Sequence, residues 1–161
     1  MVMRKRPHRK AVRSRIRIRI ATTNDLPAML YLEESGFGED RFSPQQVKYL
    51  INKARSTPYV IEFEKKIAGA AIMLWRKNSS IGRLYSIVID PKWHGKGLGS
   101  ALLEECELAA EKHKCTRIML EVRADNVRGI ALYEKFGYLR AGIIKGYYFD
   151  GMNALKMIKW L

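Results

Sequence analysis

The sequence predicts a single α/β (α+β) domain, because strand-like and helix-like apolar patterns follow one another through most of the chain. Its 161 residues, 47% of them hydrophobic, suffice for a sizeable core and leave little room for a second domain. A glycine-rich run at residues 94–100 stands between a strand-like and a helix-like segment, as expected of a ligand-binding turn. No apolar run approaches the length of a membrane span, so we expect a cytoplasmic protein without membrane contact.

Positive charge is concentrated at the N-terminus. The formal net charge is +14, and the segment from Arg4 to Arg19 holds nine Lys or Arg residues and no acid. We expect residues 1–14 to form a basic, disordered arm and residues 15–161 to form the folded domain. Such an arm is either simply solvated or makes a weak contact with RNA or the ribosome, and both alternatives stay open here.

The first elements have clear local signals. Residues 15–20 alternate Arg and Ile strictly, which predicts an edge strand with isoleucines on one face and arginines in solvent. Thr23-Asn24-Asp25 before Leu26-Pro27 is a helix start, since proline is tolerated in the first helical turn. We expect this helix to continue through Glu34 and to end at Gly36 and Gly38.

A second helix is predicted from Ser43-Pro44 to Lys53. Gln46 is placed to complete a capping box with Ser43, and Pro58 marks the exit from this region. The remaining elements complete the order β-α-α-β-β-β-α-β-α-β-β. They are strands at 59–64, 68–75 and 82–89, a helix at 98–113, a strand at 117–123, a helix at 127–135, and strands at 140–148 and 154–160.

The run His94-Gly95-Lys96-Gly97-Leu98-Gly99-Ser100 is typical of a phosphate-binding turn. Glycine at every second position lets the backbone come close to a ligand, and the N–H groups at the start of the following helix attract anions. A plain strand-to-helix turn with glycines for tight packing explains the run about as well. The run lacks the Gly-Lys-Ser/Thr ending of a nucleoside triphosphate loop, and its glycine pattern does not fit a dinucleotide fold.

Downstream motifs make the chain recognisable. They are Leu120-Glu121-Val122-Arg123, Asn126, Leu132-Tyr133-Glu134 and Phe136-Gly137-Tyr138, in that order after the glycine run. Together they resemble the GNAT superfamily of acyl-CoA-dependent N-acetyltransferases, and they look most like the RimI group, which acetylates protein N-termini. The resemblance covers residues 16–161. It implies a mixed, mostly antiparallel central sheet with helices on both faces, and acetyl-CoA as the cosubstrate.

The resemblance also implies where acetyl-CoA lies. The backbone of the strand before the glycine run would pair with the pantetheine amides, and Asn126, a predicted helix N-cap, would also reach the pantetheine arm. The family usually has Arg or Gln at the position of His94, so backbone N–H groups and Lys96 are the better candidates for the pyrophosphate. The cofactor-binding residues expected on this basis are Ile87, Val88, Ile89, Gly95, Lys96, Gly97, Leu98, Gly99, Ser100 and Asn126.

Two residues are candidates for proton transfer, and each has a structural alternative. Glu121 shares a strand face with Met119 and Arg123, where a carboxylate is costly unless it faces a cleft or finds a partner. The resemblance makes it the base for the amine, whereas the alternative is an ion pair with Arg123. Tyr133 is the general acid for the CoA sulfur in the family. Its alternative is ordinary packing beside a core stripe formed by Leu132 and Phe136.

The acceptor is less well specified. Tyr147 and Tyr148 match a Tyr-Tyr pair that the family places near the acceptor amine, although a strand end explains them too. The segment 38–44 lacks the Pro-Trp-Ser pattern of the RimI group. Its acids Glu39 and Asp40 are either solvated or placed for a cationic acceptor. We therefore expect a peptide or protein N-terminal amine as acceptor, with a small-molecule amine or a lysine side chain behind it. A non-catalytic acyl-CoA-binding or RNA-tethered module is the alternative of another class.

Overall fold

The computed structural model describes residues 15–52 and 55–161. The basic arm and Lys53, the predicted last residue of the second helix, lie outside the described residues. The strands are β1 (Ile16–Ile20), β2 (Ser56–Phe63), β3 (Lys66–Trp75), β4 (Ile81–Ile89), β5 (Arg117–Arg123), β6 (Leu139–Ile144) and β7 (Ala154–Trp160). The α-helices are α2 (Leu26–Phe37), α3 (Pro44–Asn52), α4 (Leu98–Lys112) and α5 (Val127–Lys135). Short 3-10 turns lie at Thr23–Asp25, Gly38–Asp40 and Pro91–Trp93.

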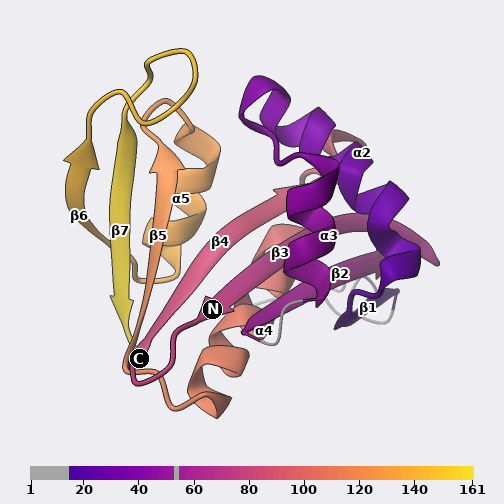
Figure 1. The fold of residues 1–161 in the computed structure, drawn as a ribbon, viewed down its shortest axis with the longest axis horizontal. Helices are drawn as coiled ribbons and strands as arrows, with labels where there is room; N and C mark the ends of the chain where they lie inside the picture. The colour runs from indigo at the N-terminus through magenta and orange to yellow at the C-terminus, as the bar shows by residue number, and fades with distance from the viewer. Residues whose placement is uncertain (1–14, 53–54) are drawn as a thin grey trace, which may run out of the picture.

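All strands join one seven-stranded sheet in the order β1-β2-β3-β4-β5-β7-β6 (Figure 1). Neighbouring strands run antiparallel except β4 and β5, which are parallel and are connected through α4. This confirms the predicted order of elements and the mixed, mostly antiparallel sheet. None of the helices in the described ranges is long and apolar enough to cross a membrane.

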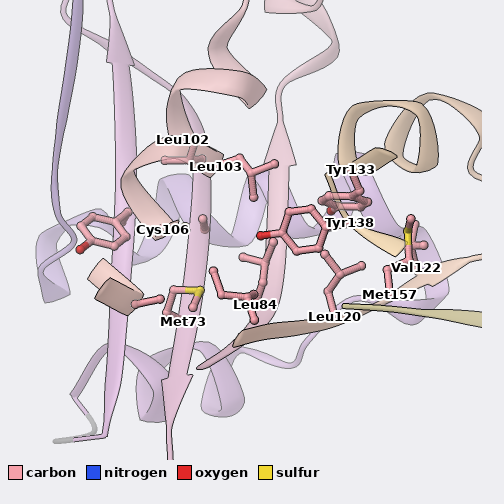
Figure 2. Close-up of a cluster of buried hydrophobic side chains, with 14 of the residues drawn as sticks. Met73, Leu84, Leu102, Leu103, Cys106, Leu120, Val122, Tyr133, Tyr138 and Met157 are labelled. Atoms are coloured by element: carbon pink, nitrogen blue, oxygen red, sulfur yellow. The ribbon is translucent and has the colours of Figure 1, made fainter. Parts of the chain in front are cut away.

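Helices cover both faces of the sheet, as β3 shows by its alternation. Ala71 and Met73 belong to a core that includes α4 and α5, whereas Ala70 and Ile72 belong to a second core under α2 and α3. Figure 2 shows the first core, where Leu102, Leu103 and Cys106 of α4 face strand side chains. Because a strand exposes alternate residues to opposite faces, one apolar strand supports both layers.

The ends of three elements differ from prediction, each for a local reason. Helix α2 runs through Gly36 to Phe37, and a Cβ on Gly36 would collide with Val88, so this glycine allows close packing on β4. Pro58 lies inside β2; β1 ends opposite Tyr59, so no β1 residue is paired with Pro58, which needs no N–H on that side. Strand β6 stops at Ile144, before Gly146 with its φ of 62°.

The register of β4 contains one extra residue. Ile72 of β3 pairs with Ser86 and Met73 pairs with Leu84, so Tyr85 is a bulge. The parallel pairing with β5 also ends at Leu84, opposite Leu120. A bulge bends a strand and increases its twist. Beyond it β4 and β5 separate, as Figure 1 shows, and a groove opens between them.

Candidate active site

The groove between β4 and β5 has a volume of about 870 Å³. Its walls come from segments far apart in the sequence: the end of α2 and the turn after it, β4, β5, α5, and the loop between β6 and β7. Six of the residues predicted for the site line it, namely Ile87, Glu121, Asn126, Tyr133, Tyr147 and Tyr148. The fold therefore brings the two proton-transfer candidates to one groove.

The glycine run forms the turn into α4. Gly95 and Gly97 have φ values of 79° and 77°, a left-handed conformation that favours glycine. Gly97 is the N-cap of α4 and no side chain caps this helix, so the N–H groups of Leu98, Gly99 and Ser100 stand at its start without a capping side chain. A Cβ at Gly95 or Gly97 would meet no atom of the described protein. Glycine is thus needed at these two positions for the left-handed backbone conformation, and not because a side chain would collide with the protein. The absence of side chains also leaves the backbone accessible to a ligand.

His94 and Lys96 have partners within the protein. The His94 Nε2 lies 2.9 Å from the carbonyl oxygen of Ile89, and its Nδ1 contacts the Arg128 guanidinium. The Lys96 ammonium lies 5.8 Å from the centre of the Phe63 ring and is exposed. His94 therefore ties the turn to the end of β4 and to α5, which agrees with the weaker ligand role expected for it.

The backbone of β4 is paired on one side only beyond the bulge. Ile87, Val88 and Ile89 pair with β3, while no β5 residue pairs with them. This stretch is therefore a strand edge on the side away from β3, where Ile87 lines the groove while Val88 and Ile89 are not among its lining residues. Asn126 is the N-cap of α5, as predicted, and its Oδ1 accepts a hydrogen bond of 2.9 Å from the Gly129 N–H. Asn126 also lines the groove.

Glu121 is paired with Arg83, not with Arg123. The Arg83 Nη2 donates to Glu121 Oε2 at 3.0 Å, from the neighbouring strand β4. The alternation of β5 is as predicted, because Ile118, Leu120 and Val122 are buried while the intervening residues face the side of α2 and α3. The ion pair with Arg123 that the sequence offered as an alternative is therefore wrong. Arg123 shares the strand face of Glu121 but bonds to Asp40 and Asp150 in the neighbouring loops. Glu121 thus has a partner and also faces the groove.

Tyr133 is more deeply buried than the sequence predicted. It is 6% exposed and belongs to the core with Ile130, while Leu132 and Phe136 pack against the same core as predicted but are only partly buried. The helix is rotated so that Tyr133 packs edge-on against Tyr138, with ring centres 5.7 Å apart (Figure 2). Burial raises the pKa of Tyr133 above its ordinary value, which keeps the hydroxyl protonated at neutral pH. A buried phenol at a groove can act as a proton donor.

Arg123 ties together two loops beside the groove, a role that the sequence did not reveal. It donates to Asp40 Oδ2 at 2.9 Å, to Asp150 Oδ2 at 2.7 Å and to Asp125 Oδ1 at 3.1 Å. Asp40 also accepts from the Phe149 N–H at 3.0 Å. The prediction that Asp40 is solvated or free for a cationic acceptor was therefore wrong. The hydrogen bonds with Arg123 lower the pKa of Asp150.

Tyr147 and Tyr148 lie in the loop between β6 and β7, beyond the end of the strand in which they were predicted. Their rings are 5.0 Å apart and nearly perpendicular. Tyr147 is exposed, while Tyr148 is half-buried beneath the Arg123 guanidinium at 5.0 Å from the ring centre. Burial raises the pKa of Tyr148 to about 12. The two rings reach the groove from the loop that Arg123 holds.

Glu33 is a buried carboxylate that sequence reasoning missed. It lies on α2 and accepts from the Phe42 N–H at 3.2 Å and from the Ser86 hydroxyl at 3.3 Å. Burial raises the pKa of Glu33. Its spacing of four residues from Met29, which is also buried, was the available signal that it shares the inner helix face. Glu33 lines the groove and connects α2 to the bulged part of β4.

Comparison with known proteins gives one consistent result. The model of the acetyltransferase (GNAT) family matches residues 25–138. The ribosomal protein bS18-alanine N-acetyltransferase of Escherichia coli K12 is 33% identical over 130 residues, covering 78% of this chain and 82% of that protein. An N-alpha-acetyltransferase of Saccharolobus solfataricus is 35% identical over 79 residues, covering 48% of this chain and 47% of that protein.

Solved structures agree with the sequence matches. The crystal structure of the ribosomal-protein-S18-alanine N-acetyltransferase from Escherichia coli has a TM-score of 0.80 and 32% identity, covering 89% of this chain and 92% of that one. A chain of the NatC complex bound to Gag peptide and CoA has a TM-score of 0.79 at 21% identity, covering 91% of this chain and 98% of that one, and shares the fold.

Proposed function

Because this chain belongs to the GNAT family of acetyltransferases, we propose that it acetylates the α-amine at the N-terminus of a protein or peptide. GNAT N-acetyltransferases use acetyl-CoA as the acetyl donor, and this chain is an N-acetyltransferase of that family. The observation that carries the choice of acceptor is the 33% identity, over most of both chains, to an enzyme that acetylates an N-terminal alanine. The groove with Glu121 and Tyr133 in its walls supports it.

The reaction proposed is a direct transfer. The acceptor nitrogen attacks the thioester carbonyl carbon, the new C–N bond forms as the C–S bond breaks, and CoA leaves as a thiolate. Glu121 accepts the proton that the amine loses, and Tyr133 donates a proton to the CoA sulfur. The Arg83 Nη2, 3.0 Å from Glu121 Oε2, orients that carboxylate. The Tyr133 hydroxyl is protonated at neutral pH, since tyrosine ordinarily has a pKa near 10 and burial raises it further.

The residues proposed for acetyl-CoA are those of the opening and the turn. The unpaired side of β4 at Ile87, Val88 and Ile89 suits the amides of the pantetheine arm, and Asn126 lies at the same groove. The uncapped start of α4 suits the pyrophosphate, with N–H groups of residues 95–100 directed to it and Lys96 adding charge. The open space at Gly95 and Gly97 fits a ligand that approaches the backbone closely.

The acceptor amine is proposed to enter past Tyr147 and Tyr148, between the loop that carries them and the end of α2. The Arg123 hydrogen bonds hold these two segments at the groove. The catalytic domain comprises residues 15–161 in this proposal. A contact of the basic residues 1–14 with RNA or ribosomes remains a prediction, which salt-dependent association would measure.

The proposal is tested with a panel of acceptors. Initial rates of CoA release are measured with peptides that differ in their first residues, with polyamines, and with lysine whose α-amine is blocked. We expect the highest kcat/KM with a peptide carrying a free N-terminus, no turnover with the same peptide acetylated beforehand, and a large loss of rate in Glu121→Gln. A higher kcat/KM with a polyamine or blocked lysine than with every peptide would overturn the choice of acceptor.

A further inference from the structure

A second groove, with a volume of about 1110 Å³, adjoins the first. It lies on the face of the sheet that carries α3, between that helix and the strands β4, β5 and β7, whose positions Figure 1 shows. Arg83, Tyr85 and Glu121 line both grooves. The two grooves therefore meet at the Glu121–Arg83 pair, and a chain whose amine reaches Glu121 has the second groove directly beside it.

The second groove is strongly basic. Lys156 faces it from β7, where it pairs with Glu121 in the strand register, and Arg55 and Arg76 line its far part. Among the described residues none of these three cations has a carboxylate partner. The only acid in its lining is Glu121, which is paired with Arg83. The groove thus carries three positive charges without a carboxylate partner, of which Lys156 is the one beside the proton-transfer site.

We propose that this groove holds an acidic segment of the acceptor polypeptide, formed by the residues that follow its acetylated N-terminus. The assignment rests on the proposed function and narrows its substrate class. Unpaired cations at a groove attract anions and disfavour a basic chain. Between the charges the floor is apolar, with Leu74, Ile81 and Met119, which suits the side chains of an extended peptide.

The state of the aromatic residues favours a peptide over single-stranded RNA. Recognition of RNA at such a surface relies on free aromatic faces on which bases stack. The Trp75 ring already stacks on His113 with centres 3.8 Å apart, and its Nε1 donates to Thr57 at 2.9 Å. The Tyr85 ring stacks on Phe42 with centres 4.9 Å apart. Two of the three aromatic residues in the lining, Trp75 and Tyr85, are thus already stacked on protein rings, which favours carboxylates over bases as ligands of the cations.

The test compares peptides with the same first two residues and with acidic, neutral or basic residues at positions three to six. We expect the acidic peptide to have a KM lower than the neutral one by roughly five- to tenfold, a difference that shrinks as salt is raised. Lys156→Glu and Arg76→Glu should each weaken the preference for the acidic peptide, and the two changes together should reverse it, because they turn the net charge at the positions of Arg55, Arg76 and Lys156 negative. Binding of the same peptides, labelled with fluorescein at the C-terminus, is followed by anisotropy.

Lys48→Glu is the matched control, because Lys48 is an exposed lysine of α3 outside the groove lining and the change in net charge is the same. It should leave the acidic preference intact. Turnover of peptides without any dependence on acidic residues overturns the groove assignment and leaves N-terminal acetylation standing, whereas no turnover of any peptide overturns both. An RNA oligonucleotide that binds through Lys156 and Arg76 more tightly than the acidic peptide overturns it in favour of nucleic acid.

Discussion

The two sides of the groove between β4 and β5 are lined by different kinds of groups. On the side of α4 and α5 the walls are backbone and buried side chains: the turn at Gly97, the strand edge of β4, and Tyr133 in the core. On the side of α2 and α3 they are charged side chains, with the Glu121–Arg83 pair and the carboxylates around Arg123. Backbone recognition depends on conformation and suits an invariant ligand, whereas exposed side chains can be exchanged to change the acceptor.

The largest effect is expected from Tyr133→Phe, which tests whether the buried side supplies a proton as well as packing. Removal of the hydroxyl should lower kcat on the order of a hundredfold, because the group acts mainly in the transition state. The KM for acetyl-CoA should change little, and stability should fall by roughly 1 kcal/mol. Near-parental kcat with the true acceptor would leave the buried side with a structural role only. Tyr138→Phe, in the adjacent ring, is the control for loss of a buried hydroxyl.

Gly97→Val should weaken acetyl-CoA binding by roughly tenfold or more, because a β-branched residue is strained at a φ of 77° and obstructs approach to the backbone. Gly97→Asn is the matched control, since asparagine tolerates the left-handed conformation far better. Calorimetry on the folded variants measures the affinity. Equal affinity of the valine variant and the parent would mean that the backbone side does not hold the pyrophosphate.

Arg123→Gln should raise the KM for the acceptor by about fivefold and leave the KM for acetyl-CoA unchanged, because it releases the loops with Asp40 and Asp150 on the charged side only. Arg140→Gln is the control, an exposed arginine with one carboxylate partner away from the groove. Equal changes in both KM values would contradict the separation of the two sides.

The smallest effect concerns Glu33, the carboxylate buried on the charged side. Burial raises its folded-state pKa, so the folded protein binds a proton more tightly than the unfolded chain does. The free energy of unfolding therefore falls as pH rises from the unfolded pKa of about 4.3 through the raised folded value. Glu33→Gln should lack this decline and gain on the parent by on the order of 1 kcal/mol toward neutral pH. Denaturant unfolding at several pH values measures it, and parallel curves would exclude titration of Glu33 in this range.

Much of the fold was predictable because its signals are local. Strand β5, helix α5 and strand β7 lie where periodicity and capping residues predicted them, and the hydrogen bonds between Ser43 and Gln46 confirm the capping box. The misplaced ends involve tertiary contacts. Gly36 continues a helix because it packs on Val88, and a proline is accepted in β2 because the neighbouring strand has ended. Neither contact is encoded near the residue concerned.

The predictability of the site differs between the two sides of the groove in the same way. The glycine turn and the Asn126 cap were predictable from consecutive residues. The partner of Glu121 was not, since Arg83 lies 38 positions away, and Asp40 joins Arg123 across 83 positions. The burial of Tyr133 depends on the rotation of α5, which a nine-residue helix with apolar residues on neighbouring faces does not fix by itself. Charged networks of this kind are decided by the fold.

The groove between β4 and β5 depends on the number of residues in β4, because the bulge at Tyr85 adds one residue to this strand. Before it Leu84 faces α4, and after it Ile87 and Ile89 face the same way while Val88 faces α2, so the single extra residue reverses the parity of the strand. Deleting Tyr85 would join Leu84 to Ser86 in regular alternation, with Ile87 still facing α4 and Val88 still facing α2, and it would remove the bend at which β5 departs. Substitutions in β4 can be conservative, but a change in its length cannot. We therefore expect homologues to vary in the composition of this strand and to keep its length.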